Sequence, residues 1–424
     1  MAKKTKSKEH RLKHKDEIFA KIVSQIINSD YIDTLTYRKA NGRLKMKAVS
    51  RTVLLLLLIS LLTLTSNSQL VKTEPTITKG SRGSKAIENI AIMVQKDAYA
   101  ILRPYLKQYA SDVADTFNFK VRIFKGSWPN HLDVRAKLQK IYRVFNISGC
   151  ILVGNIPYAS YRAEYGAYLF PTDIYYMDLD GTWIDENGDG IFEERIDPDT
   201  IEIWVSRIKP PIDDVNLIID FLEKNHKCRT GRLDIPKRAL IFQENDGEIW
   251  GPRRVDVLRV LYDQDNIMAL YRESETTKTN YIDALNFGHE FLFINSHGGP
   301  WSQYIEEPTG SRTFTYMDAK NLEKGCIFYL LFSCEVGRYT ANNYLAGWYV
   351  FGNSHGLAAL ASTTVWESID HVMFIKKLRS NYVGKAFFEI IKYADILAQT
   401  DAIVARNLYY GATIIGDPLL QLGD

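Results

Sequence analysis

Two short apolar segments in the last third of the chain each lead to a side chain that can act as a nucleophile or a base. Residues 291–295 lead to His297. Residues 326–332 lead to Cys334. Apolar runs of this length are typical of buried strands in a parallel sheet, and ligands bind beyond the carboxyl ends of such strands. If the two strands are neighbours, the imidazole can take the thiol proton and the thiolate can attack a substrate.

The residues that follow His297 support the same chemistry. Gly298 and Gly299 allow the backbone to approach a substrate closely. The amides of Gly298 and Cys334 would then form an oxyanion hole for a polarised carbonyl. Taken alone, a histidine at a strand end is usually a structural polar cap, and a buried cysteine is usually a small core residue. The ordered pair of strand ends favours a catalytic Cys–His dyad over these alternatives.

The elements that position this pair alternate between strand and helix patterns. Strands are predicted at residues 87–95, 119–124, 149–155, 201–207, 238–244, 291–295, 326–332 and 356–362. Helices are predicted at residues 97–116, 132–145, 215–227, 252–261, 281–287, 316–322, 370–379 and 383–398. This alternation predicts an α/β fold with a mainly parallel sheet flanked by helices.

Composition sets the class of protein. The chain has 424 residues, of which 46% are hydrophobic, which is enough for a large core and for two domains. The formal net charge of +3 is small, and the basic excess lies in the first 45 residues. We therefore expect no nucleic-acid partner.

A mostly apolar run at residues 53–64 fits the hydrophobic region of a secretory signal. Basic residues precede it, and small polar residues follow it. Residues 46–68 therefore predict a signal peptide, with Met46 as the true start and residues 1–45 as a basic upstream extension. An uncleaved membrane anchor and a buried core helix are the alternatives. Both export interpretations place the rest of the chain outside the cytoplasm, with membrane contact through this segment alone.

The chain has four cysteines: Cys150, Cys228, Cys326 and Cys334. An even number outside the cell favours disulfides, so Cys150 and Cys228 either pair or remain free. The spacing matches no zinc site. A nucleophilic Cys334 has to stay unpaired.

An acidic segment separates the two series of strands and helices. Asp185, Asn187, Asp189 and Gly190 match the first half of an EF-hand loop, but the twelfth position is Ile196 rather than Glu. A structural calcium ion is one interpretation, and a solvated turn is the other. The predicted calcium ligands are Asp178, Asp180, Asp185, Asn187, Asp189 and Glu193. The chemistry itself requires no cofactor.

These motifs together resemble the gingipain-type cysteine peptidases, which belong to the caspase-like clan. The resemblance extends from residue 87 to the C-terminus and rests on the His297–Gly298 and Ser333–Cys334 strand ends, the acidic segment, and residues 203–207, 359–362 and 416–418. It implies two caspase-like subdomains with mainly parallel sheets, the second of which carries the dyad. It also implies hydrolysis of peptide bonds in protein or peptide substrates through an acyl-enzyme, and loops stabilised by calcium.

The resemblance is incomplete around the dyad. The caspase signature at the nucleophile is absent, since Cys334 is followed by Glu335. Some family members orient the histidine with an upstream acidic residue, and Glu244 is our choice for this role over Asp246. The alternative function is a calcium-binding surface or adhesive protein on an inactive peptidase scaffold. The predicted organisation is 1–45 extension, 46–68 signal or anchor, 69–86 linker, 87–230 first subdomain and 231–424 catalytic subdomain.

Overall fold

The computed structural model describes residues 87–163, 168–196, 200–244, 246–365, 370–398 and 408–423. The predicted extension, signal segment and linker (1–86) lie outside these residues. Among the helices that the structure describes, none combines the length and hydrophobicity needed to cross a membrane.

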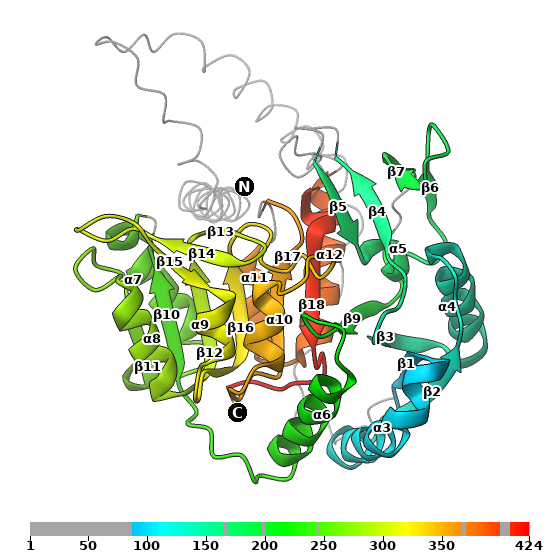
Figure 1. Cartoon of the computed structure of the whole chain (residues 1–424), viewed down its shortest axis with the longest axis horizontal. Coiled ribbons are helices and arrows are strands. Elements are labelled where there is room, and N and C mark those ends of the chain that lie inside the picture. The colour runs from blue at the N-terminus through cyan, green and yellow to red at the C-terminus, as the bar shows by residue number, and fades with distance from the viewer. Residues whose placement is uncertain are drawn as a thin grey trace, which may run out of the picture. The chain divides into compact units, whose positions relative to one another are not determined.

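A ten-stranded sheet runs through the molecule in the order β11-β10-β12-β16-β17-β18-β9-β3-β1-β2 (Figure 1). Its strands are β1 (Asn89–Gln95), β2 (Lys120–Gly126), β3 (Ile147–Val153), β9 (Trp204–Ile208), β10 (Ala239–Gln243), β11 (Ile267–Leu270), β12 (His289–Asn295), β16 (Cys326–Phe332), β17 (Ala358–Ser362) and β18 (Ala412–Gly416). Every pair in it is parallel except β17–β18, which is antiparallel. The prediction of an α/β fold with a mainly parallel sheet is confirmed.

Strand β18 joins the two halves of this sheet. It comes from the C-terminal end of the chain, pairs with β17 on one side and pairs with β9 on the other. The strands before and after the acidic segment therefore share one hydrogen-bonded sheet. The reversal between β17 and β18 also means that the two sets of parallel strands run in opposite directions.

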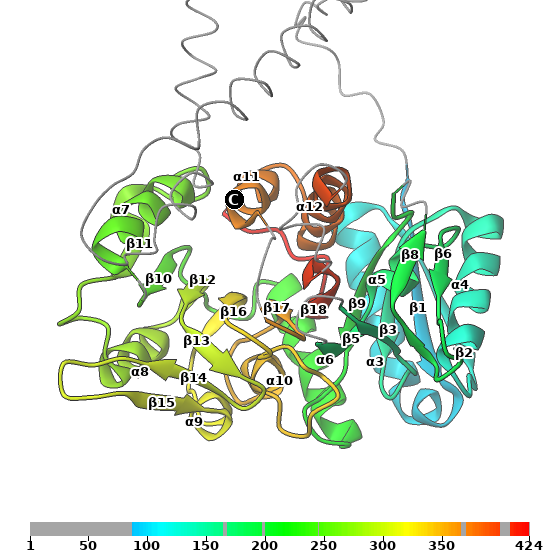
Figure 2. The same ribbon diagram turned by 90° about the horizontal axis from the view of Figure 1, so that it is seen from above.

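Helices cover both faces of the sheet because its strands are apolar on both sides (Figure 2). They are α3 (Lys96–Phe117), α4 (His131–Phe145), α6 (Val215–Arg229), α7 (Gly247–Leu258), α8 (Lys278–Phe287), α9 (Tyr316–Lys320), α10 (Leu345–Phe351), α11 (His371–Leu378) and α12 (Val383–Ala398), with the short α5 (Ile174–Met177) beside them. Figure 2 shows α7, α11, α12 and α4 on one side and α8, α9, α10, α6 and α3 on the other. The predicted start of α7 at Pro252 is wrong, since the helix begins at Gly247 and contains that proline.

Three small sheets lie outside the main one. They are formed by β4 (Ala159–Arg162), β5 (Leu169–Thr172) and β7 (Ile191–Phe192), by β6 (Thr182–Ile184) and β8 (Glu194–Ile196), and by β13 (His297–Gly299), β14 (Ser302–Ile305) and β15 (Arg312–Thr315). None of these three sheets was predicted from the sequence, because strands of two to four residues are too short for a periodic pattern.

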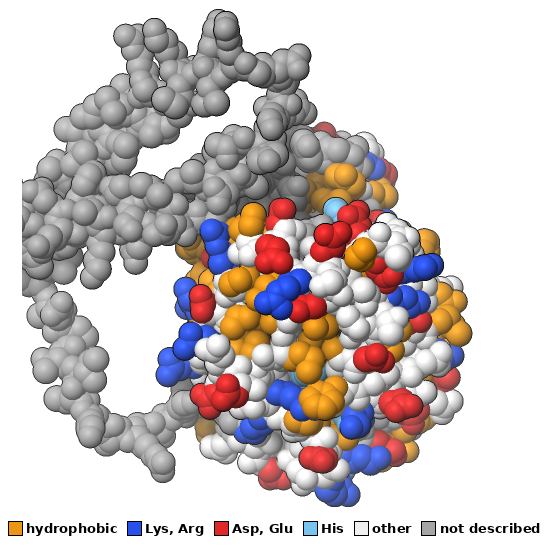
Figure 3. All heavy atoms as spheres, turned by 90° about the vertical axis from the view of Figure 1, so that its left-hand side faces the viewer, with side chains coloured by type: hydrophobic (Ala, Val, Ile, Leu, Met, Phe, Trp, Pro, Cys, Tyr) orange, Lys and Arg blue, Asp and Glu red, His pale blue; other side chains and the backbone are white. Residues whose placement is uncertain are grey.

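The surface over β11, α7 and α8 carries acidic, basic and hydrophobic side chains side by side (Figure 3). A nucleic-acid-binding surface would instead concentrate Lys and Arg on one face. Lys and Arg are therefore not concentrated on this part of the surface (Figure 3).

Candidate active site

His297 and Cys334 follow adjacent strands of the large sheet. Strands β12 and β16 are parallel and in register, with Asn295 opposite Phe332. Each reactive residue comes two positions after the last residue of its strand. His297 and Cys334 therefore both lie at the carboxyl ends of these parallel strands. His297 is exposed, and Cys334 is half-buried with a free thiol. The structure thus confirms that the two strands are neighbours.

Gly298 packs directly against the segment that carries the cysteine. A Cβ atom on Gly298 would lie 3.0 Å from the Ser333 Cβ atom and 3.2 Å from the Cys334 carbonyl oxygen. It would also lie 3.1 Å from a methyl group of Val336. These distances are shorter than ordinary carbon contacts, so only glycine fits without displacing the cysteine segment. The close contact links the two strand ends independently of the sheet register.

The backbone turns sharply after Cys334. Glu335 has a φ of 57°, a left-handed conformation that costs a non-glycine residue roughly 1–3 kcal/mol. Its N–H donates to the Thr364 carbonyl at 2.8 Å, and the Gly337 N–H donates to the Ser362 carbonyl at 2.8 Å. Within the described residues, the Cys334 N–H itself has no acceptor, which leaves it available to a substrate oxygen.

Glu244 follows β10, the strand on the other side of β12. Its N–H donates to the Asn295 carbonyl at 3.1 Å, and its Oε1 atom accepts from the Glu306 N–H at 2.8 Å. The Oε2 atom is buried without a hydrogen-bond partner among the described residues. Burial raises the pKa of this carboxyl group, while the Glu306 amide and the charge of His297 act in the opposite direction. Glu244 is therefore electrostatically coupled to His297, whereas Asp246 precedes α7 as its cap.

The hairpin formed by β13 and β14 was not predicted, yet it contains His297 and places two aromatic residues near it. Tyr304 lies opposite His297 in this hairpin and is 46% exposed. Trp301 is 53% exposed and donates through Nε1 to the Asn342 carbonyl at 2.9 Å. Both rings therefore face solvent next to the dyad rather than covering the core.

The first of the predicted calcium ligands, Asp178, is already bonded to protein donors. Its carboxylate accepts from the Gly181 N–H at 2.7 Å, from Trp183 Nε1 at 2.8 Å and from Arg195 Nε at 2.6 Å. The residue is fully buried. A buried carboxylate with this set of donors stabilises the fold around it.

Asp180 lies with Asp178 and with Glu202, a residue that was not among the predicted calcium ligands. One carboxylate oxygen from each of the three lies within 4.8 Å of the others. Burial, with the neighbouring charges of Asp180 and Asp178, raises the pKa of Glu202 to about 7, while the hydrogen bond from the Leu179 amide acts in the opposite direction. Two of the predicted calcium ligands, Asp178 and Asp180, therefore lie in this group.

The tip of the acidic loop contains the other predicted ligands. Asp185 accepts from the N–H groups of Gly188 at 2.7 Å and Gly190 at 2.8 Å, and the Asn187 side chain accepts from the Asp189 N–H at 2.9 Å. These bonds are those of the compact turn that Asp, Asn and Gly favour.

A guanidinium group lies against this tip. Arg162 bonds Asp189 at 3.1 Å and Glu193 at 2.5 Å. The six predicted ligands therefore do not form one group in this structure. Asp178 and Asp180 belong to the first group, and Asp185, Asn187, Asp189 and Glu193 to the second.

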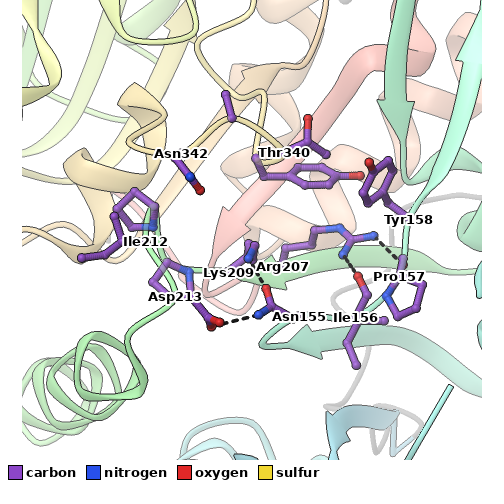
Figure 4. A pocket seen from close by; sticks show the side chains of 14 residues that line it. Asn155, Ile156, Pro157, Tyr158, Arg207, Lys209, Ile212, Asp213, Thr340 and Asn342 are labelled. Atoms are coloured by element: carbon purple, nitrogen blue, oxygen red, sulfur yellow. Dashed lines mark hydrogen bonds between the residues drawn. The ribbon is translucent and has the colours of Figure 1, made fainter. Parts of the chain in front are cut away.

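A separate hollow of about 250 Å³ lies between the β3–β4 connection, the end of β9 and the loop that follows Cys334 (Figure 4). Its polar side chains bond one another, since Lys209 donates to Asn155 and Asn155 donates to Asp213 at 2.9 Å. Arg207 forms part of its wall and donates to the Ile156 carbonyl at 2.9 Å. Neither residue of the predicted dyad lines this hollow.

The mostly parallel sheet flanked by helices is that of the caspase-like cysteine peptidases. The model of peptidase family C25 matches residues 126–423, which is well over half of the chain. The chain therefore belongs to this family, the gingipain-type cysteine peptidases. No curated protein and no solved structure shows significant similarity to it.

Proposed function

We propose that this cysteine peptidase is an endopeptidase that uses Cys334 as nucleophile and His297 as acid and base. The observation that carries the proposal is the register of β12 and β16, together with the packing of Gly298 against the Cys334 segment. Family membership supports protein or peptide substrates.

The geometry supports the following sequence of steps. The Cys334 thiolate attacks the scissile carbonyl carbon, and the amides of Gly298 and Cys334 stabilise the oxyanion that forms. Protonated His297 gives its proton to the leaving amine, which breaks the peptide bond and leaves a thioester on Cys334. His297 then removes a proton from water, and the hydroxide attacks the thioester, which releases the acid product and restores the Cys334 thiolate beside protonated His297.

A peptide probe with an electrophilic acyloxymethyl ketone tests this assignment directly. The probe should alkylate the intact chain once, and mass spectrometry of the digest should place the adduct on Cys334. Modification of another cysteine at the same rate, or no modification while peptide cleavage continues, would rule out Cys334 as the nucleophile.

We propose that Glu244 orients His297, on the basis of its coupling to that residue. Glu244→Gln should lower kcat/KM by about tenfold or more, because the amide cannot stabilise an imidazolium as a carboxylate does. Since burial raises the pKa of this carboxyl group in the folded state, its charge destabilises the fold above the ordinary glutamate pKa.

The same substitution should therefore raise the thermal unfolding temperature at pH 7, and this gain should vanish below about pH 4. Kinetics and thermal scans at both pH values measure the two effects. An orienting role would be contradicted if activity were unchanged, and a purely structural role would instead lower both activity and stability.

A structural calcium ion at the tip of the acidic loop remains a proposal, supported by Asp185, Asn187, Asp189 and Glu193. An ion bound there has to replace the Arg162 guanidinium, which already neutralises two of the carboxylates. We expect Arg162→Ala to make the unfolding temperature more sensitive to added calcium than it is in the wild type, and Asp185→Asn to remove that sensitivity. Equal temperatures with calcium and with chelator in all three proteins would exclude the ion.

The alternative, an adhesive protein on an inactive scaffold, would be favoured by a disulfide at Cys334, but that thiol is free. Export of the chain is likewise proposed from residues 46–68 alone. Cell fractionation tests it, and recovery of the chain in the cytoplasm alone would contradict it. N-terminal sequencing of the exported protein then separates a cleaved signal peptide from an uncleaved anchor.

A further inference from the structure

A chain of buried polar side chains lies beneath the ends of β12 and β16 and takes no part in the proposed chemical steps. Its members come from five different segments: Tyr281 on α8, Tyr349 on α10, Gln303 on β14, Ser333 after β16 and Ser296 after β12. All five are buried, and Gln303 is 0% exposed. Buried polar groups of this kind are stable only when they bond one another.

The bonds form one continuous series. The hydroxyl groups of Tyr281 and Tyr349 are 2.8 Å apart, and Tyr349 donates to Gln303 Oε1 at 2.8 Å. Gln303 Nε2 donates to Ser333 Oγ at 3.0 Å. The Ser333 and Ser296 Oγ atoms are 3.1 Å apart.

The series ends at the two residues that immediately precede the dyad. Ser296 is followed by His297, and Ser333 is followed by Cys334. Gln303 also lies opposite Gly298 in the β13–β14 pairing. Its amide therefore connects the hairpin that contains His297 to the segment that contains Cys334.

Only a side chain of this length with a donor at one atom and an acceptor at the other satisfies both neighbours. Asn is one methylene shorter and cannot span from Tyr349 to Ser333. Leu has a similar volume but removes one buried hydrogen bond from Tyr349 and one from Ser333, which then keep only their bonds to Tyr281 and Ser296.

We propose that Gln303 is a positioning residue, which fixes the distance and direction between His297 and Cys334 through Ser296 and Ser333. This inference rests on the proposed function of the dyad. A displacement of about 1 Å between reacting groups can lower the rate of a chemical step about 100-fold. Loss of the Gln303 amide should therefore reduce kcat while leaving KM nearly unchanged, because Gln303 is buried and does not contact the substrate.

The test compares Gln303→Leu with Tyr281→Phe in the full-length protein. Both substitutions remove buried hydrogen bonds of the same series, but Tyr281 lies at its far end and does not touch Ser333. We expect Gln303→Leu to lower kcat by about 10- to 100-fold and Tyr281→Phe to leave it close to the wild-type value. The rate at which iodoacetamide alkylates Cys334 between pH 5 and 8 should shift for Gln303→Leu alone, since it reports the Cys–His geometry.

A double-mutant cycle with Ser333→Ala shows whether Gln303 acts through Ser333. The double variant should be no slower than Gln303→Leu, whereas independent structural effects would multiply. If Gln303→Leu does not fold, Ser333→Ala removes the bond to Gln303, together with the bond to Ser296, by deleting one oxygen atom and should lower kcat at least as much.

Two outcomes overturn the inference and differ from each other. An active wild type in which Gln303→Leu behaves like Tyr281→Phe, or in which Ser333→Ala keeps full kcat, refutes the positioning role but leaves the dyad intact. A wild type with neither peptidase activity nor a Cys334 that alkylates faster than Cys228 refutes the proposed function itself, and the positioning role with it.

Discussion

Replacing Cys334 with alanine is expected to lower kcat/KM for peptide hydrolysis by about 10³-fold or more. Without the thiol no thioester forms, and water has to attack the peptide directly with only the binding site and the amides to assist it. Cys334→Ser should be almost as inactive, because a serine hydroxyl is far less acidic than a thiol and forms very little of the anion that attacks the carbonyl carbon. Initial rates on a mixed peptide library measure both variants.

Cys228→Ala is the matched control for these substitutions. Cys228 is also a partly buried free cysteine, but it lies on α6, and burial raises the pKa of its thiol to about 11. This variant should keep the wild-type rate. If Cys334→Ala retained activity while Cys228→Ala lost it, the nucleophile would be misassigned. Loss of activity with chelator but not with thiol reagents would indicate a metal-dependent hydrolase instead.

Much of the fold could be predicted because its strands are apolar on both faces. The seven residues of β16 are nearly all buried. In a chain that alternates strands and helices, a short apolar run of this kind is typical of a central strand in a parallel sheet. Strand β18 was missed, although Thr413, Ile414 and Ile415 are residues that favour strands. A run of five residues does not indicate its partners, and the position of β18 depends on β17 and β9, which lie far away in the sequence.

Some residues of the candidate site are indicated by the sequence around them, and others are not. His297 and Cys334 follow apolar runs directly, so the rule for parallel sheets places them at one edge. Gln303 carries no such signal, because its importance depends on the burial of one side chain in a four-residue strand whose other side chains include the exposed Tyr304. The acidic loop shows the same limit, since Arg195 and Arg162 bind its carboxylates from positions that no motif relates to them.

Breaking the buried ion pair between Asp173 and Arg207 is expected to cause the largest loss of stability. Arg207 donates through Nε to Asp173 at 2.9 Å, and both side chains are 1% exposed. Asp173 also accepts from Tyr339 Oη at 3.2 Å and from Thr413 Oγ1 at 3.1 Å. One carboxylate thus connects β9, β18 and the loop that follows Cys334.

Arg207→Met should lower the free energy of unfolding by about 3–5 kcal/mol, because it leaves a buried carboxylate without its cation. Removing both charges in the double variant Asp173→Asn with Arg207→Met should be less harmful than the sum of the single changes. Urea unfolding followed by circular dichroism measures all three variants. Arg272→Met, which breaks the exposed pair with Glu275, is the control and should change stability little.

If Arg207→Met lowered the free energy of unfolding no more than this control, the ion pair would not stabilise the contact between the two halves of the sheet. If instead the loss is large and the surviving folded fraction also cleaves peptides slowly, the loop after Cys334 depends on this contact. That result is expected, because Tyr339 lies five residues after the nucleophile and packs its ring 4.4 Å from the Arg207 guanidinium. Strand β9, which carries Arg207, would then stabilise the loop that follows Cys334 as well as the sheet.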